Sequence, residues 1–134
     1  MILDTHVWVW LNIGSEKLRS ETVTAIESAA KFGRVNIPAI VPWEVATLVA
    51  KGRLTLKLPI GEWIEEALSK QGVSLINLTP QIAVESTVLP GRFHGDPADR
   101  LIIATSRITH IPIITRDEKI LAYAKTGFIT AISA

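Results

Sequence analysis

The stretch DPADRLIIATSRITHIPIITRD, residues Asp96 to Asp117, contains the order of elements that decides the fold. Its first residues fit the start of a helix, because Asp is a favoured N-cap and Pro is favoured at the first helical position. Apolar side chains then recur at helical spacing up to Thr105. The apolar run from Ile111 to Thr115 predicts a buried strand that ends just before Asp117. This stretch therefore predicts a helix, a strand and the start of a second helix. An acidic residue, Asp96 or Asp117, stands at the start of each of the two helices.

The same alternation runs through the rest of the chain. Strands are predicted at Ile2–Leu3, Val35–Ile40, Val73–Leu78, Ile111–Thr115 and Phe128–Ile132. Helices are predicted between Asp4 and Gly14, Ser20 and Gly33, Pro42 and Lys51, Ile60 and Lys70, Thr79 and Leu89, Asp96 and Thr105, and from Asp117 onward. Strands that alternate with helices of this length predict a three-layer α/β/α sandwich with a mainly parallel sheet.

Composition restricts the class of protein. The 134 residues predict a single domain over residues 1–134. Although 48% of them are hydrophobic, no uncharged stretch reaches the roughly 18 residues of a membrane span, so no membrane role is expected. The start, Met1 to Asp4, has no basic or long apolar leader, which favours the cytoplasm. The chain has no cysteine for a disulfide or thiolate site, and a net charge of +1 does not by itself indicate nucleic-acid binding.

Four acidic residues stand where a strand is predicted to give way to a helix, or in the first turn of a helix: Asp4, Glu44, Asp99 and Asp117. In a parallel α/β sheet, residues at the carboxyl ends of the strands meet at one edge. Carboxylates about 4 Å apart repel by roughly 1 to 4 kcal/mol for each pair at effective dielectrics of about 80 to 20. The pattern therefore predicts a site for a hard divalent cation, Mg²⁺ or Mn²⁺.

Each acid also has a structural explanation. Asp4 and Asp117 are suitable N-caps, and Glu44 in a first turn would gain from the helix dipole. Asp99 fits the N3 position behind Asp96 as N-cap, in a near capping box. Taken one at a time, the acids leave capping and metal binding open. The metal site is predicted from their shared placement.

Three arginines flank these acids: Arg92, Arg100 and Arg116. They are candidates for substrate contact, because a guanidinium can hold a phosphate with two hydrogen bonds. Neutralisation of the neighbouring acids is an equally good explanation. The three histidines lack metal-ligand spacing and are expected to be surface or packing residues.

The chain has four tryptophans, which is many for a small domain. Core or partner packing is favoured over base stacking for these side chains. Because tryptophan is enriched at interfaces, we expect an apolar groove near Trp8, Trp10 and Trp63 that receives a partner. Full burial of all three within one molecule would exclude that groove.

The combined motifs resemble those of PIN-domain ribonucleases, in particular the toxin half of VapBC-type toxin–antitoxin pairs. The resemblance spans nearly the whole chain and rests on Leu3-Asp4-Thr5-His6, Trp43-Glu44-Val45-Ala46, the stretch from His94 to Ala104, and Thr115-Arg116-Asp117. A departure is found at Val41 and Pro42, where many relatives have a small polar residue before the Trp-Glu pair.

The resemblance implies a function and a site. The family's metal-binding acids map onto Asp4, Glu44, Asp99 and Asp117, with Asp96 as a helper and Thr115 as a polar neighbour. It implies RNA cleavage with Mg²⁺ or Mn²⁺, and Thr115 joins the three arginines as a candidate substrate contact. The implied partners are the RNA substrate, a cognate antitoxin whose helix packs over the toxin, and a second copy in a homodimer.

Other functions remain to be separated from this one. A non-catalytic PIN-like binding module would keep the acids as a docking pocket for an arginine of a protein partner. A phosphoaspartate phosphatase would need a second Asp two residues after Asp4, where His6 stands. A receiver-type signalling domain would need adjacent acids after the first strand, and these are absent. Metal-dependent RNA cleavage separates the enzyme from the binding module.

Overall fold

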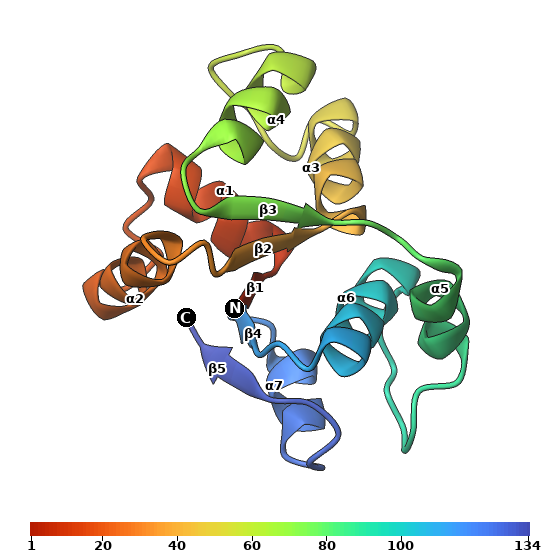
Figure 1. Cartoon of the computed structure of the whole chain (residues 1–134). Helices are drawn as coiled ribbons and strands as arrows, with labels where there is room; N and C mark the ends of the chain where they lie inside the picture. Colours follow the sequence, from red (N-terminus) through yellow and green to blue (C-terminus); the bar gives the residue numbers. More distant parts are fainter.

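Seven helices surround one five-stranded sheet (Figure 1) in the computed structural model, which describes all 134 residues. The strands are β1 (Ile2–Leu3), β2 (Val35–Pro38), β3 (Val73–Ile76), β4 (Ile113–Thr115) and β5 (Ala131–Ser133). The helices are α1 (Thr5–Ile13), α2 (Ser20–Ala30), α3 (Ile40–Ala50), α4 (Ile60–Ser69), α5 (Pro80–Thr87), α6 (Pro97–Thr109) and α7 (Glu118–Ala124). Every strand pair is parallel, which confirms the predicted α/β sandwich.

The strand order is β3-β2-β1-β4-β5, so β1 is the central strand. The chain first builds outward from β1 to β3 and then returns through α5 and α6 to β4, on the other side of β1 (Figure 1). In the register, Leu3 of β1 pairs with Ile114 of β4. Such a reversal creates a crevice outside the carboxyl ends of the two strands, where open α/β folds bind their ligands.

A cluster of 25 buried hydrophobic residues fills the space between the sheet and the helices. It includes Ile2 and Leu3 of the central strand, Trp8 of α1 and Ile103 of α6. Because β1 is short and entirely buried, the core fixes the backbone position of Asp4, the residue that follows it. None of the helices is long and apolar enough to cross a membrane.

Three element boundaries differ from the prediction. Helix α3 begins at Ile40 rather than near Pro42, so Glu44 lies in its second turn and not in its first. Pro42 is tolerated there because the first amides of a helix have no intrahelical acceptor to lose. The predicted buried strand Val73–Leu78 is an edge strand that ends at Ile76, and its Leu75 is 44% exposed. The last strand runs from Ala131 to Ser133.

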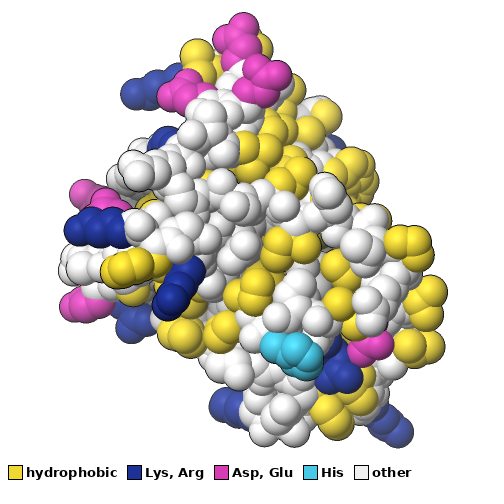
Figure 2. Space-filling view, in the orientation of Figure 1, with side chains coloured by type: hydrophobic (Ala, Val, Ile, Leu, Met, Phe, Trp, Pro, Cys, Tyr) yellow, Lys and Arg dark blue, Asp and Glu magenta, His cyan; other side chains and the backbone are white.

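Two of the three tryptophans that were expected to line a groove are core residues. Trp8 and Trp63 pack edge to face in the core, with ring centroids 5.2 Å apart, and only Trp10 remains partly exposed. Trp43 is instead the exposed tryptophan, at 59%. Hydrophobic side chains also gather on the right of Figure 2, the side that α5 and α6 occupy in Figure 1. The exposed ones near α5 are Leu78, Val84 and Val88.

Candidate metal centre

Two acids cap helices that start directly after the central strands. Asp4 follows β1 and accepts a hydrogen bond from the Val7 amide at 2.9 Å, as N-cap of α1. Asp117 follows β4 and accepts one from the Ile120 amide at 2.9 Å, as N-cap of α7. Because β1 and β4 are neighbouring parallel strands, both caps lie at the same edge of the sheet. The strand order reverses beside β1, and open α/β folds bind their ligands at such a point of the sheet.

Thr115 connects these two acids. Its side chain is 0% exposed. The Thr115 hydroxyl donates a hydrogen bond to Asp4 Oδ2 and accepts one from the Asp117 amide at 2.9 Å. The structure thus places the hydroxyl of Thr115, a candidate substrate contact, in the interior, where both of its hydrogen bonds are made to neighbouring residues. Thr115 thereby sets the position of Asp4 relative to Asp117.

Glu44 is held by a threonine that the sequence reading did not select. The Thr5 hydroxyl donates a hydrogen bond to Glu44 Oε1 at 2.5 Å, across 39 residues of chain. Thr5 is buried as the first residue of α1, directly after Asp4. Its position directly after Asp4, at the end of a predicted strand, is the sequence feature that could have identified it. The bond links α3 to α1, and thereby links Glu44 to the Asp4 end of the site.

The start of α6 agrees with the prediction. Asp96 is the N-cap and accepts a hydrogen bond from the Asp99 amide at 2.9 Å, with Pro97 next in the first turn. Asp99 lies at the N3 position, and its half-buried carboxylate accepts no hydrogen bond from the protein. The capping function thus belongs to Asp96. The Asp99 carboxylate is left free for a ligand.

The carboxylates lie close enough to shift one another's protonation. Burial, followed by the charges of Asp96, Asp117, Glu44 and Asp4, raises the pKa of Asp99 to about 7. Burial also raises the pKa of Asp4, against the hydrogen bonds from Thr115 and Val7 that lower it. For Glu44, burial raises the pKa and the Thr5 hydrogen bond opposes this. Burial and mutual repulsion thus disfavour the ionised form of these carboxylates, and a bound cation would stabilise that form.

The donor set fits a hard cation, because every candidate ligand is a carboxylate oxygen. No group of three or more His, Cys, Asp or Glu side chains is arranged to hold a metal ion in this structure, however. The structure brings Asp4, Glu44, Asp96, Asp99 and Asp117 into electrostatic range of one another. A shared metal ion stays a prediction.

Two of the three candidate arginines bind backbone carbonyls. Arg100 donates to the carbonyls of Ser86 and Phe93, at 2.8 and 3.0 Å, and so holds the loop before α6 against α5. Arg116 donates to the Lys17 carbonyl at 2.7 Å. Arg92 is exposed. The structure therefore assigns structural contacts to Arg100 and Arg116.

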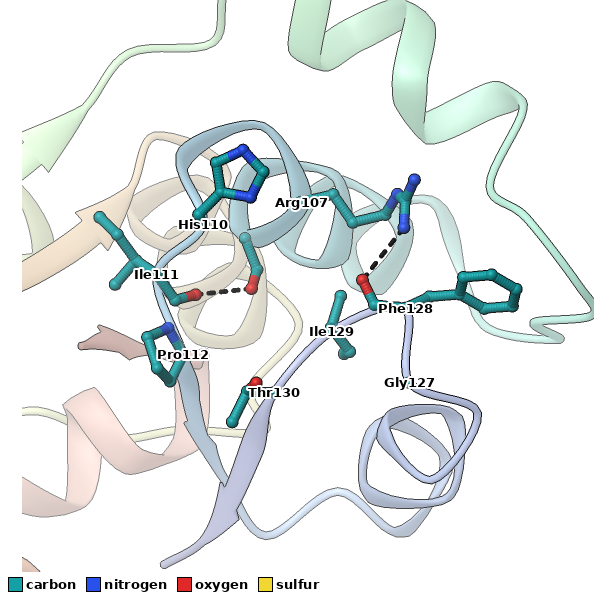
Figure 3. A pocket seen from close by; sticks show the side chains of 9 residues that line it. Arg107, His110, Ile111, Pro112, Gly127, Phe128, Ile129 and Thr130 are labelled. Atoms are coloured by element: carbon teal, nitrogen blue, oxygen red, sulfur yellow. Dashed lines mark hydrogen bonds between the residues drawn. The ribbon is translucent and has the colours of Figure 1, made fainter.

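A separate hollow lies at the opposite edge of the sheet, before β4 and β5 begin (Figure 3). It has a volume of about 240 Å³ and lies between the end of α6 and the segment from Gly127 to Thr130. Arg107 there donates to the Phe128 carbonyl at 3.0 Å (Figure 3). Arg107 also pairs with Glu85 at 2.6 Å. Because none of the five acids lines this hollow, it is not part of the acidic site.

The chain is similar in sequence to known proteins over most of its length. A model of the PIN domain family matches residues 1–126. Ribonuclease VapC22 of Mycobacterium tuberculosis (strain ATCC 25618 / H37Rv) is 31% identical over 123 residues, which cover 92% of this chain and 91% of the relative.

Solved structures share the fold. A chain of VapBC2 from Rickettsia felis, bound to a DNA fragment from its promoter, has a TM-score of 0.73 at 18% identity and covers 99% of this chain and 97% of its own. A chain of a toxin–antitoxin complex from Klebsiella pneumoniae has a TM-score of 0.58 at 23% identity, over 87% and 85% of the two chains. A chain of FitAB bound to an IR36 DNA fragment has a TM-score of 0.60 at 16% identity, over 98% and 93%.

Proposed function

The chain belongs to the PIN domain family, and we propose that it is a metal-dependent endoribonuclease, the toxin of a type II toxin–antitoxin pair. The named ribonuclease that is 31% identical supports the activity, and the toxin–antitoxin complexes that share the fold support an antitoxin partner. The whole chain, residues 1–134, would act as one PIN-like domain on RNA in the cytoplasm. A homodimer is a further proposal, and the exposed Leu78, Val84 and Val88 offer it apolar surface.

Asp4, Glu44, Asp99 and Asp117 would hold Mg²⁺ or Mn²⁺, and the exposed Asp96 would be an additional ligand. A bound divalent ion lowers the pKa of a water molecule and offsets charge on the phosphate that is attacked. The protein supplies orientation. Thr115 holds Asp4 between the two central strands, and Thr5 holds Glu44 on the facing helix.

Asp99 is the observation that carries this proposal. A half-buried carboxylate without a hydrogen bond, whose pKa is raised to about 7 by burial and by four other acids, is costly to the apo protein. Residues with such perturbed pKa values concentrate at functional sites. A helix cap alone does not explain Asp99, because Asp96 already caps α6.

The test is cleavage of a generic single-stranded RNA in EDTA, Mg²⁺ and Mn²⁺. We expect cleavage with either metal and none in EDTA, since the site offers no His pair or lysine as a metal-independent acid and base. Asp99→Asn should abolish cleavage. Glu66→Gln is the matched control, because Glu66 is exposed near the end of α4, which leads into the opposite edge of the sheet.

Absence of cleavage under all these conditions would contradict the proposal and favour the non-catalytic binding module. That module would instead bind a protein partner through the acidic pocket, and Asp99→Asn would weaken this binding. Cleavage that persists in EDTA would leave the nuclease but exclude the metal site.

A further inference from the structure

An exposed strip of three side chains begins beside the acidic site. His6 and Trp10 lie one turn apart on α1, with ring centroids 5.7 Å apart and planes inclined by 48°. The Lys17 ammonium lies 5.7 Å from the centroid of the Trp10 ring. His6 and Lys17 are exposed and Trp10 is half-buried. We call this set the α1 strip.

The strip is positioned by the same elements that build the acidic site. His6 stands two residues after Asp4, and its imidazole is near enough to lower the pKa of both Asp4 and Glu44. At the other end, the Lys17 amide donates to the Ser15 hydroxyl at 3.2 Å, and the Lys17 carbonyl accepts from Arg116 at 2.7 Å.

Arg116 therefore has a use that its place beside Asp117 did not reveal. It ties the turn that carries Lys17 to the end of β4, next to the acids. Because Leu18 is buried in the core, the turn is anchored on both sides of the Lys17 carbonyl. Lys17 is thus presented from a fixed backbone, although its side chain is exposed.

We propose that His6, Trp10 and Lys17 form a subsite for single-stranded RNA, in which a base stacks on the aromatic surface and Lys17 pairs with a neighbouring phosphate. Every base has a flat face that can stack on an aromatic ring, and cationic side chains follow the sugar–phosphate backbone. The subsite rests on the proposed nuclease function, and it would hold the nucleotides beside the bond that is cut. Lys17 brings a positive charge to the far end of the strip, where it would attract a phosphate of the strand.

The test measures binding and cleavage of a short fluorescein-labelled single-stranded RNA, with Ca²⁺ in place of Mg²⁺ for the binding assay. Lys17→Gln should reduce the slope of log K against log salt concentration by about 0.7, the value for one phosphate contact on a single strand. Lys31→Gln is the control, because Lys31 is exposed at the end of α2, at the opposite edge of the sheet. Its slope should equal that of the parent.

Trp10→Leu keeps an apolar side chain at the half-buried position and removes the stacking surface. We expect it to weaken RNA binding about tenfold, within the range measured for the loss of one base–aromatic stack. His6→Ala should act in the same direction. In cleavage assays with Mg²⁺ the Trp10 and Lys17 variants should raise KM and leave kcat near the parent value, because these two side chains bind substrate without touching the reacting atoms.

Parent values of RNA affinity, salt slope and KM in the Lys17 and Trp10 variants would overturn the subsite, and would leave the strip as plain surface or a protein contact. If the parent cuts RNA in that case, the proposed function stands without the subsite. If the parent binds RNA through the strip but does not cut it, only the proposed function fails. A parent that does neither contradicts both.

Discussion

Asp99 and Asp96 separate two roles that one sequence motif combined. Asp96 provides the hydrogen bond that caps α6, and Asp99 keeps a free carboxylate among other acids. The sequence predicted both positions in the helix correctly, because capping is a local property. It could not assign the free carboxylate, since the burial and charges that raise the pKa of Asp99 come from elements far apart in the chain.

The raised pKa of Asp99 predicts how stability depends on pH. The pKa of Asp99 is about 7 in the folded protein and 3.8 in an unperturbed carboxyl. Its contribution to the free energy of unfolding is therefore fully present below about pH 4, and this stabilisation is lost as the pH rises to about 7. We therefore expect Asp99→Asn to stabilise the metal-free protein above pH 7 relative to the parent. The difference should disappear near pH 4.

The measurement is urea unfolding of parent and Asp99→Asn in EDTA across this pH range, repeated with Mg²⁺. The ion should stabilise the parent more than the variant, because ligand binding to the folded state raises stability. A variant that is less stable than the parent at pH 8 in EDTA would indicate a structural role for Asp99.

Thr5 provides a second test at the level of single residues. Thr5→Val removes the hydroxyl that donates to Glu44 and keeps the shape of the buried side chain. A hydrogen bond to a charged group contributes about 1.5 to 3 kcal/mol, which corresponds to roughly a 10- to 100-fold loss of kcat if Glu44 must be held in place. Thr5→Ser should restore most of the activity. Equal kcat in Thr5→Val and the parent would show that Glu44 needs no such support.

Among the elements, the loop into α6 has a close approach that requires glycine. A Cβ at Gly95 would lie 2.2 Å from the Phe93 ring, which is buried in the core, and 3.2 Å from the Asp99 Cβ. Gly95→Ala should therefore destabilise the fold by about 1 to 3 kcal/mol and displace the acids at the start of α6. We expect the midpoint of urea unfolding and the RNA cleavage rate to fall together. Gly61→Ala is a control, because a Cβ there meets nothing within 4 Å.

The tryptophans allow a direct comparison between core and surface. Trp63→Ala should cost about 3 to 5 kcal/mol of unfolding free energy, since Trp63 packs against Trp8 in the core. Trp43→Ala should change it by about 0.5 kcal/mol or less, because the side chain is 59% exposed. Chemical denaturation of both variants measures the two values. A large loss in Trp43→Ala would place that ring in an interface that forms in solution.

The order of strands and helices could be predicted from the sequence. The position of each strand within the sheet, and which side chains are buried as a result, could not. Local signals such as Pro97, Gly14 and the apolar run before Thr115 mark where elements begin and end. The position of β3 at the edge of the sheet depends on which strands pair, so the apolar run Val73–Ile76 did not reveal that Leu75 is exposed. For the same reason Trp63 was placed at a surface groove.

At the scale of the whole molecule, the topology creates the candidate site. The chain passes from β1 to β3 and returns to β4 beside β1, which brings Asp4 and Asp117 to one edge although they lie near opposite ends of the sequence. Helices α3 and α6 then supply Glu44 and Asp99. These acids were predicted from their placement where a strand gives way to a helix or in the first turn of a helix, and the resemblance named Thr115 as their polar neighbour. That Thr5 is the hydrogen-bond partner of Glu44 became evident only in three dimensions.

The central claim is that these carboxylates hold one divalent cation site for RNA cleavage, and anomalous scattering from crystals soaked in Mn²⁺ tests it most directly. We predict an anomalous peak bounded by Asp4, Glu44, Asp99 and Asp117, at about 2 Å from the oxygens that bind the ion directly. The peak should be absent in Asp99→Asn crystals treated in the same way. An active protein whose manganese peak lies elsewhere, or which shows no peak among these acids, would contradict the claim.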